Sequence, residues 1–374
     1  MPQGSLKILN WNIGGAKYLQ LKSKDSPRCP DERKSREHFR EKLNAVLVDL
    51  LEKNTPDVVS LQEVVRYEEN GDEPHSQQII DVPDNYENFS LWLIDTQHHS
   101  HQGKWDKVRE EGEWTEDAFF AQGNSILIRK TIPYFPIYGL PVVGKRHSAS
   151  VTRDRIEVVK LESGLYFGDR NTEPRAALVA HLVLDQLTDE HGNIQDLKRP
   201  LDVFVINVHL TTLMFEREGV PEIDEEAAQT RLRQLGIVLD GIVSRYNKWR
   251  KDRFKIRGKE VKPRDGETRE RHPPIWVIAG DFNFTPESIE YLTLLRKGFI
   301  DLLPAHHLGT KASGLGNKPS LTLDYVFAGP KFEAIDPGFA KEGMKGNHVQ
   351  WDHSTKISDH FPLIVDVPIA LADP

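Results

Sequence analysis

Polar side chains that can bind metal ions or move protons recur where apolar stretches of this chain end. Asp281 and Asn283 follow the apolar run 276–279, and Asn207 and His209 close an earlier run. Residues separated by one position point the same way in an extended chain, so each pair would present its side chains together. Such groups can bind a hard cation, orient a water molecule or transfer a proton. Taken singly, each is equally consistent with a cap on a turn.

Further polar residues hold the same kind of position elsewhere. Asn12 and Glu63 end apolar stretches, Asp324 lies within one, and Asp359 and His360 come just before one. A carboxylate inside an apolar strand is costly unless another group pairs with it. A histidine backed by such a carboxylate would be a suitable base.

The apolar stretches that carry these residues predict strands, and helical patterns lie between some of them. We predict strands at 6–12, 57–63, 89–94, 124–128, 156–161, 176–184, 201–210, 275–281, 321–328 and 363–367, and helices at 39–53, 224–249 and 286–295. Continuous apolar runs are typical of strands buried on both faces, and this order favours sheets with helices packed outside. The strand ends of packed sheets can meet at one rim, where such folds hold ligands.

Two sets of basic residues are candidates for contact with phosphate. Arg175 precedes the apolar run 176–180 and is either a surface residue or a phosphate contact. Residues 245–271 are rich in Lys and Arg, but they lead into the start of the strand that ends at Asp281. At about 3.3 Å per residue, this separates their charge from Asp281 by about 20 Å. We expect a solvated extension there, with a remote docking patch as the alternative.

Composition favours one α/β core. The chain has 374 residues, 38% of them hydrophobic, and no linker, so we predict a single domain over 1–374 with insertions near 95–122 and 245–272. A net charge of −8 provides no general attraction to nucleic acid or anionic membrane. The single Cys29, the missing signal-peptide pattern and the lack of a long apolar segment predict a cytoplasmic protein without a membrane span. Nothing indicates an obligate protein partner.

Seven short motifs together resemble the endonuclease/exonuclease/phosphatase superfamily, the fold of DNase I. They are Asn10-Trp11-Asn12, Leu61-Gln62-Glu63, Gly123-Asn124-Ser125-Ile126-Leu127, Asn207-Val208-His209-Leu210, Gly280-Asp281-Phe282-Asn283, Leu323-Asp324-Tyr325 and Ser358-Asp359-His360. The resemblance implies a four-layer α/β sandwich, in which two mixed β-sheets pack face to face with helices outside. It also implies one Mg²⁺ or Mn²⁺ centre.

The resemblance implies roles for the metal-binding residues and for the residues that hold water. Glu63 would be the main metal ligand, with Asn12 beside it and Asp359 reaching toward the metal. Asp281 and Asn283 would position the attacking water and the phosphate.

The same resemblance implies roles for the remaining residues. His360, oriented by Asp324, would be the base or a transition-state stabiliser, and His209 would assist the leaving oxygen. Family members divide these two tasks differently, so both assignments stay open. Arg175 and Asn207 would contact the substrate phosphate.

These residues predict divalent-metal-dependent hydrolysis of a phosphate ester, with a phosphodiesterase acting on DNA or RNA as the leading hypothesis. The alternatives are a phosphomonoesterase or lipid phosphodiesterase acting on a small head group, and a non-catalytic phosphate-binding protein. Gly14 stands where AP endonucleases carry an aspartate, and Cys29 lies outside any Trp-Cys-Asp-Arg element of the inositol 5-phosphatases. Both departures argue against those branches.

Overall fold

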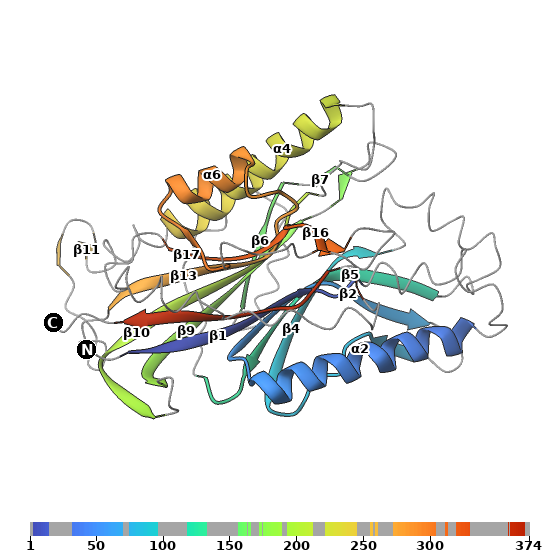
Figure 1. The fold of residues 1–374 in the computed structure, drawn as a ribbon, viewed down its shortest axis with the longest axis horizontal. Coiled ribbons are helices and arrows are strands. Elements are labelled where there is room, and N and C mark those ends of the chain that lie inside the picture. Colours follow the sequence, from blue (N-terminus) through green and yellow to red (C-terminus); the bar gives the residue numbers. More distant parts are fainter. Residues whose placement is uncertain are drawn as a thin grey trace.

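The structure is a computed structural model built around two mixed β-sheets that pack face to face (Figure 1). It describes residues 3–14, 32–69, 75–95, 118–132, 156–162, 164–165, 172–173, 175–188, 193–211, 221–244, 255–256, 259–260, 272–303, 311–312, 319–329, 358 and 360–370. Helices cover the outer faces of both sheets, with α2 on one side of the molecule and α4 and α6 on the other (Figure 1). This is the predicted α/β sandwich.

The first sheet holds both ends of the described chain. Its order is β18 (Leu363–Ala370), β1 (Gln3–Asn12), β2 (Val58–Glu69), β5 (Ala118–Arg129) and β4 (Tyr86–Asp95), with β3 (His75–Gln78) also paired to β2. β1 and β2 run parallel, and the other pairs are antiparallel. Helix α2 (Glu32–Asn54) packs its apolar side on the outer face of this sheet.

The second sheet is also mixed. Its order is β14 (Ile300–Asp301), β17 (Asp324–Gly329), β13 (His272–Asp281), β10 (Ile194–His209), β9 (Ala176–Thr188) and β6 (Ile156–Lys160). β10 and β13 are parallel neighbours. Helix α4 (Pro221–Gly236), its continuation as the π-helix η1 (Ile237–Ser244), and α6 (Ile289–Arg296) lie over its outer face (Figure 1).

Three short pairs of strands complete the described elements. They are β7 (Gly164–Leu165) with β8 (Thr172–Glu173), β11 (Lys255–Ile256) with β12 (Lys259–Glu260), and β15 (Lys311–Ala312) with β16 (Pro319–Leu321). No helix in these described ranges is long and apolar enough to cross a membrane.

Side-chain alternation along β1 explains how the layers are held together. Leu6 and Ile8 belong to the core between the sheets, whereas Leu9 and Trp11 belong to the core beneath α2. Successive residues of a strand point to opposite faces, so a continuous apolar run fills both cores at once. The same alternation turns the polar residue Asn12 toward the second sheet, on the side of Ile8.

The predicted strands are all present, with different limits. β10 begins before the predicted 201, and β4 and β5 extend toward the insertion at 95–122. Residues 96–117, and the part of the basic segment that precedes β13 apart from two short strands, lie outside the described ranges. Asp324 opens β17 rather than lying inside a strand, and the helix predicted at 286–295 begins at Ile289, capped by the Ser288 side chain. Within the helix predicted at 224–249, Ile237–Ser244 form a π-helix, and residues 245–249 lie outside the described ranges.

Candidate active site

The ends of three strands meet at one rim between the sheets. Asn12 ends β1, His209 ends β10 and Asp281 ends β13. Asn12 Nδ2 donates a hydrogen bond to Asp281 Oδ2 at 2.9 Å, which joins the first sheet to the second. Both side chains are buried. The predicted convergence of polar strand ends is therefore present in the described structure.

Glu63 reaches this rim by an irregularity in its strand. We expected Glu63 at the exit of a strand, but β2 continues to Glu69. In regular alternation Glu63 would lie on the α2 side, next to Leu61. Instead, the pairing with β5 shifts register between Leu61 and Val64, and Glu63 has a φ of 55°. This bulge aims the carboxylate at the rim, where Glu63 Oε1 accepts a hydrogen bond from Asn12 Nδ2 at 3.1 Å.

Asp281 and Asn283 are held by the turn that follows β13. Asn283 has a φ of 53°, and its backbone nitrogen donates to Asp281 Oδ1 at 3.0 Å. Its side-chain nitrogen donates to the carbonyl oxygen of Leu210 at 3.1 Å. The Leu210 nitrogen in turn donates to the carbonyl oxygen of Asp281 at 2.9 Å. The two loops after β10 and β13 are therefore fixed to each other.

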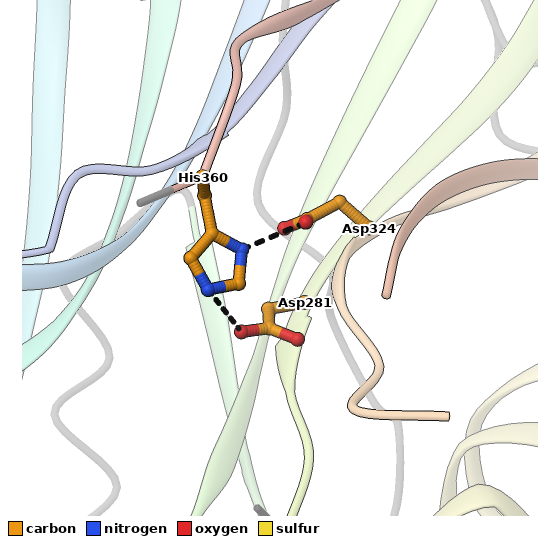
Figure 2. A group of neighbouring side chains, drawn as sticks. All are labelled: Asp281, Asp324 and His360. Carbon is orange, nitrogen blue, oxygen red and sulfur yellow. Dashed lines mark hydrogen bonds and ion pairs between the residues drawn. The ribbon is translucent and has the colours of Figure 1, made fainter. Parts of the chain in front are cut away.

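His360 lies between two carboxylates (Figure 2). Its Nδ1 is 2.8 Å from Asp324 Oδ2, and its Nε2 is 3.8 Å from Asp281 Oδ2. A hydrogen bond to a carboxylate fixes the proton on Nδ1 in the neutral ring and leaves the Nε2 lone pair facing Asp281. Trp11 Nε1 anchors the His360 backbone by donating to its carbonyl oxygen at 3.0 Å.

His209, the last residue of β10, approaches the same oxygen. Its Nε2 is 3.7 Å from Asp281 Oδ2. Burial lowers the pKa of His209 well below its usual value, and the positive charge of Arg175, joined by that of His360 when its ring is protonated, lowers it further. The imidazole is therefore neutral near pH 7.

The remaining predicted residues differ in how they relate to the rim. Arg175 is buried, and its charge acts on His209. Asn207 donates from Nδ2 to the carbonyl oxygens of Leu61 and Ser125, at 3.0 and 2.8 Å. These bonds use both amide hydrogens of Asn207, so the geometry does not favour the predicted phosphate contact for it. Asp359 lies outside the described residues.

The side chains at the rim suit a hard divalent cation. The carboxylates of Glu63 and Asp281 share the Asn12 amide, and hard oxygen donors of this kind are the ligands of Mg²⁺ and Mn²⁺. Asp281, Asp324 and His360 also present ligand atoms within 4.8 Å of one another. In that second group, the short bond between His360 and Asp324 occupies the facing atoms, so an oriented histidine is the simpler explanation of their closeness.

The comparisons with known proteins agree with this fold and these motifs. The pattern of the Endonuclease/Exonuclease/phosphatase family matches residues 9–360. The chain therefore belongs to the endonuclease/exonuclease/phosphatase family. Members of this family are generally hydrolases of phosphate esters, and they commonly use divalent metals. No curated protein sequence matches the chain.

Solved structures resemble the chain over its length at low sequence identity. An endonuclease/exonuclease/phosphatase from Beutenbergia cavernae is 18% identical, with a TM-score of 0.50 over 99% of this chain and 72% of that one. The human Nocturnin catalytic domain is 13% identical, with a TM-score of 0.44 over 98% and 95%. A family protein from Bacteroides thetaiotaomicron is 11% identical, with a TM-score of 0.47 over 100% of both chains.

Two residues at the base of the rim were not predicted as site residues. Asn10 and Gln62 belong to recognised motifs, but only their neighbours Asn12 and Glu63 received roles. Both are fully buried amides within apolar strands. A buried amide needs hydrogen-bond partners. The positions of Asn10 and Gln62 within apolar strands therefore indicated that other polar groups face them.

Proposed function

We propose that the protein is a divalent-metal-dependent phosphodiesterase, with nucleic acid as the first substrate class to test. The observation that carries this proposal is the position of Asp281 Oδ2, which lies beside the Asn12 amide and both imidazoles. A carboxylate, a fixed amide and two buried histidines at one point can hold a water molecule against a phosphate ester and receive its proton. The nucleic-acid assignment rests on the family, whose description names nucleases.

Oxygen ligands for Mg²⁺ or Mn²⁺ would come from Glu63 and Asp281. Asn12 turns its nitrogen to both carboxylates, while its oxygen accepts a hydrogen bond from the Gly14 nitrogen at 3.0 Å. An amide nitrogen cannot bind a cation, so we assign Asn12 to holding the two carboxylates together in place of the predicted direct ligand role. When bound, the metal would neutralise charge on the phosphoryl oxygens. Asp359 stays a predicted ligand.

The two histidines differ in their electrostatic surroundings, and this favours one division of tasks. His360 faces the Asp324 carboxylate, which stabilises the charged ring that forms when Nε2 takes a proton from water. His209 faces the positive charge of Arg175, which opposes protonation. We therefore assign His360 as the base and His209 as a neutral hydrogen-bonding partner of the phosphate. Asn283 would hold the turn that keeps Asp281 in place.

Turnover of bis(4-nitrophenyl) phosphate tests the reaction class. The purified protein should hydrolyse it with Mg²⁺ or Mn²⁺ and lose this activity with a chelator. Glu63→Gln should remove most of the activity, whereas Glu52→Gln, an exposed change on α2, should leave it intact. Equal activity in Glu63→Gln and wild type would contradict the metal assignment.

A substrate panel separates the substrate classes. Single-stranded and double-stranded DNA, RNA, a phosphomonoester and a phospholipid head group would be compared at equal metal concentration. The largest kcat/KM on a nucleic acid is expected. Preference for the monoester would overturn the nucleic-acid assignment and support a phosphomonoesterase. Preference for the head group would support a lipid phosphodiesterase. No turnover of any substrate would support a binding protein.

A further inference from the structure

A buried set of amides lies directly beneath the candidate site and links the two sheets. Gln62 Nε2 is within hydrogen-bond distance of Asn10 Oδ1 at 3.0 Å, Ser60 Oγ at 3.0 Å and Asn207 Oδ1 at 2.9 Å. Asn10 Nδ2 donates to the carbonyl oxygen of Gly280 at 3.2 Å. Gln62, Asn10 and Asn207 are each 0% exposed. We call these three residues the amide bridge.

Backbone carbonyls determine the orientation of two of the three amides in the bridge. The Asn10 nitrogen must face Gly280, and the Asn207 nitrogen must face Leu61 and Ser125, because carbonyl oxygens only accept hydrogen bonds. The side-chain oxygens of Asn10 and Asn207 are therefore both turned toward the position that Gln62 Nε2 occupies. Only a hydrogen-bond donor is favourable between two amide oxygens, and Gln62 provides it. The arrangement has one low-energy form.

Each part of the bridge lies one or two positions before a candidate site residue. Asn10 precedes Asn12 by two positions on β1, and Asn207 precedes His209 by two on β10. Gln62 directly precedes Glu63, at the point where the β2 bulge begins. The fourth strand takes part through its backbone, because the Gly280 carbonyl precedes Asp281. The bridge therefore joins the four strands that carry Asn12, Glu63, His209 and Asp281.

We propose that the amide bridge is a positioning device, which sets the distance between the first-sheet residues and the second-sheet residues of the site. The proposal rests on the proposed function, since it concerns how that site is held. Apolar contacts between sheets allow small sliding movements, whereas fixed hydrogen-bond directions do not. Gln62, which is the donor between the side-chain oxygens of Asn10 and Asn207 in the described part of the chain, is the central member. Gln62 is 0% exposed and would act through its neighbours rather than on metal or substrate.

The decisive variant is Gln62→Met, which keeps the length of the side chain and removes the Nε2 hydrogen-bond donor. The protein should stay folded, judged by circular dichroism and a cooperative thermal transition. Its affinity for Mn²⁺, measured from the electron paramagnetic resonance signal of free Mn²⁺, should fall about 10- to 100-fold. Its kcat should fall by a similar factor with a smaller change in KM. Wild-type affinity and kcat in this variant would overturn the proposal.

Two controls separate positioning from stability. Asn44→Asp disturbs another buried asparagine, which fastens α2 to Ile79 and Asp81 in the segment that follows β3. It should lower stability while leaving Mn²⁺ affinity and kcat unchanged. Ser60→Ala removes a bond within β2 alone and should also leave both unchanged. If Asn44→Asp reduces Mn²⁺ affinity as much as Gln62→Met does, the effect is general loss of stability and the proposal fails.

A crystal structure of Gln62→Met gives an answer that is independent of activity. The bonds from Asn12 Nδ2 to Glu63 Oε1 and to Asp281 Oδ2 should lengthen or break; unchanged bonds would overturn the proposal. Asn10→Ala serves the same purpose if Gln62→Met does not fold, since it removes the link to Gly280. Wild-type protein that neither binds Mn²⁺ nor hydrolyses phosphate esters would refute the proposed function, and these two structures would still decide the bridge.

Discussion

Among the candidate site residues that the structure describes, Glu63 and Asn283 have left-handed backbone, at φ of 55° and 53°. For residues with a β-carbon, this conformation costs about 1–2 kcal/mol. Each conformation places a site group. At Glu63 it turns the carboxylate to the other face of the strand, and at Asn283 it closes the turn that holds Asp281. Stability is therefore given up at the rim for geometry.

A pair of variants measures this strain at Glu63. Glu63→Ala keeps the β-carbon and Glu63→Gly removes it, while both remove the carboxylate. We expect the Gly variant to be more stable than the Ala variant by about 1 kcal/mol in urea unfolding. Ordinary strand positions show the reverse order, since glycine weakens a strand. An Ala variant as stable as the Gly variant would show that the backbone at Glu63 is unstrained.

The His360–Asp324 pair has a matched counterpart outside the site. His181 Nε2 lies 2.8 Å from Asp202 Oδ1, in an equally buried setting on β9 and β10. Asp324→Asn should lower kcat about 100-fold or more with little change in KM, because the amide cannot stabilise a charged His360 ring. Asp202→Asn should lower the melting temperature and leave kcat intact. Equal kcat losses would remove the special role of Asp324.

At the scale of elements, Gly280 fixes how closely β10 and β13 lie. A β-carbon there would come within 1.9 Å of the Val208 carbonyl oxygen, whereas one at Gly236 would meet nothing within 4 Å. Gly280→Ala should therefore cost more than about 3 kcal/mol of unfolding free energy and reduce activity through the shift of Asp281. Gly236→Ala, in α4, should be neutral or stabilising by up to about 1 kcal/mol. Similar stabilities for the two variants would contradict the close approach.

Asp301 predicts a pH dependence of stability in the element pair α6–β14. Its carboxylate accepts hydrogen bonds from the Tyr291 hydroxyl and the Leu303 nitrogen, at 3.0 and 2.9 Å. Burial raises the pKa of Asp301 from 3.8 to about 6, although both hydrogen bonds oppose the rise. Between these values the folded protein holds a proton that the unfolded chain has lost, so this group destabilises the fold as pH rises from about 4 to 6.

Asp301→Asn tests that dependence. The neutral amide does not ionise, so it should remove the loss of stability that wild type shows as pH rises. The difference in unfolding free energy, variant minus wild type, should therefore increase by at most about 3 kcal/mol between pH 4 and pH 7. Urea unfolding across this pH range measures it. Parallel curves for the two proteins would mean that the carboxyl ionises normally.

The sequence was informative about elements and less so about how they are joined. Apolar runs predicted the strands, and they also predicted that Asn12, His209 and Asp281 lie at strand ends, as they do at the ends of β1, β10 and β13. Periodicity did not predict the bulge at Glu63, because its neighbours include no glycine to signal a left-handed residue. Nor did it show that Asn207 faces Leu61 across the sheets, since that pairing is tertiary.

At the scale of the whole molecule, metal binding should be coupled to folding. The carboxylates of Glu63 and Asp281 come from different sheets and meet only in the folded chain. A ligand that binds only the folded state stabilises it by about 2.7 kcal/mol at a concentration of 100 Kd. The melting temperature should therefore rise with Mn²⁺ concentration in wild type and not in Glu63→Gln. An equal rise in both would place the bound ion elsewhere.

The pairing of β1 with β18 has a consequence for synthesis on the ribosome. β1 contributes Asn12, while His360 stands just before β18, and Ser358 Oγ donates to the Asn12 carbonyl oxygen at 2.8 Å. The first and last strands of the described chain are thus direct neighbours. A nascent chain long enough to gather Glu63, Asp281 and His209 still lacks His360. The candidate site can therefore be complete only after this last segment has been translated.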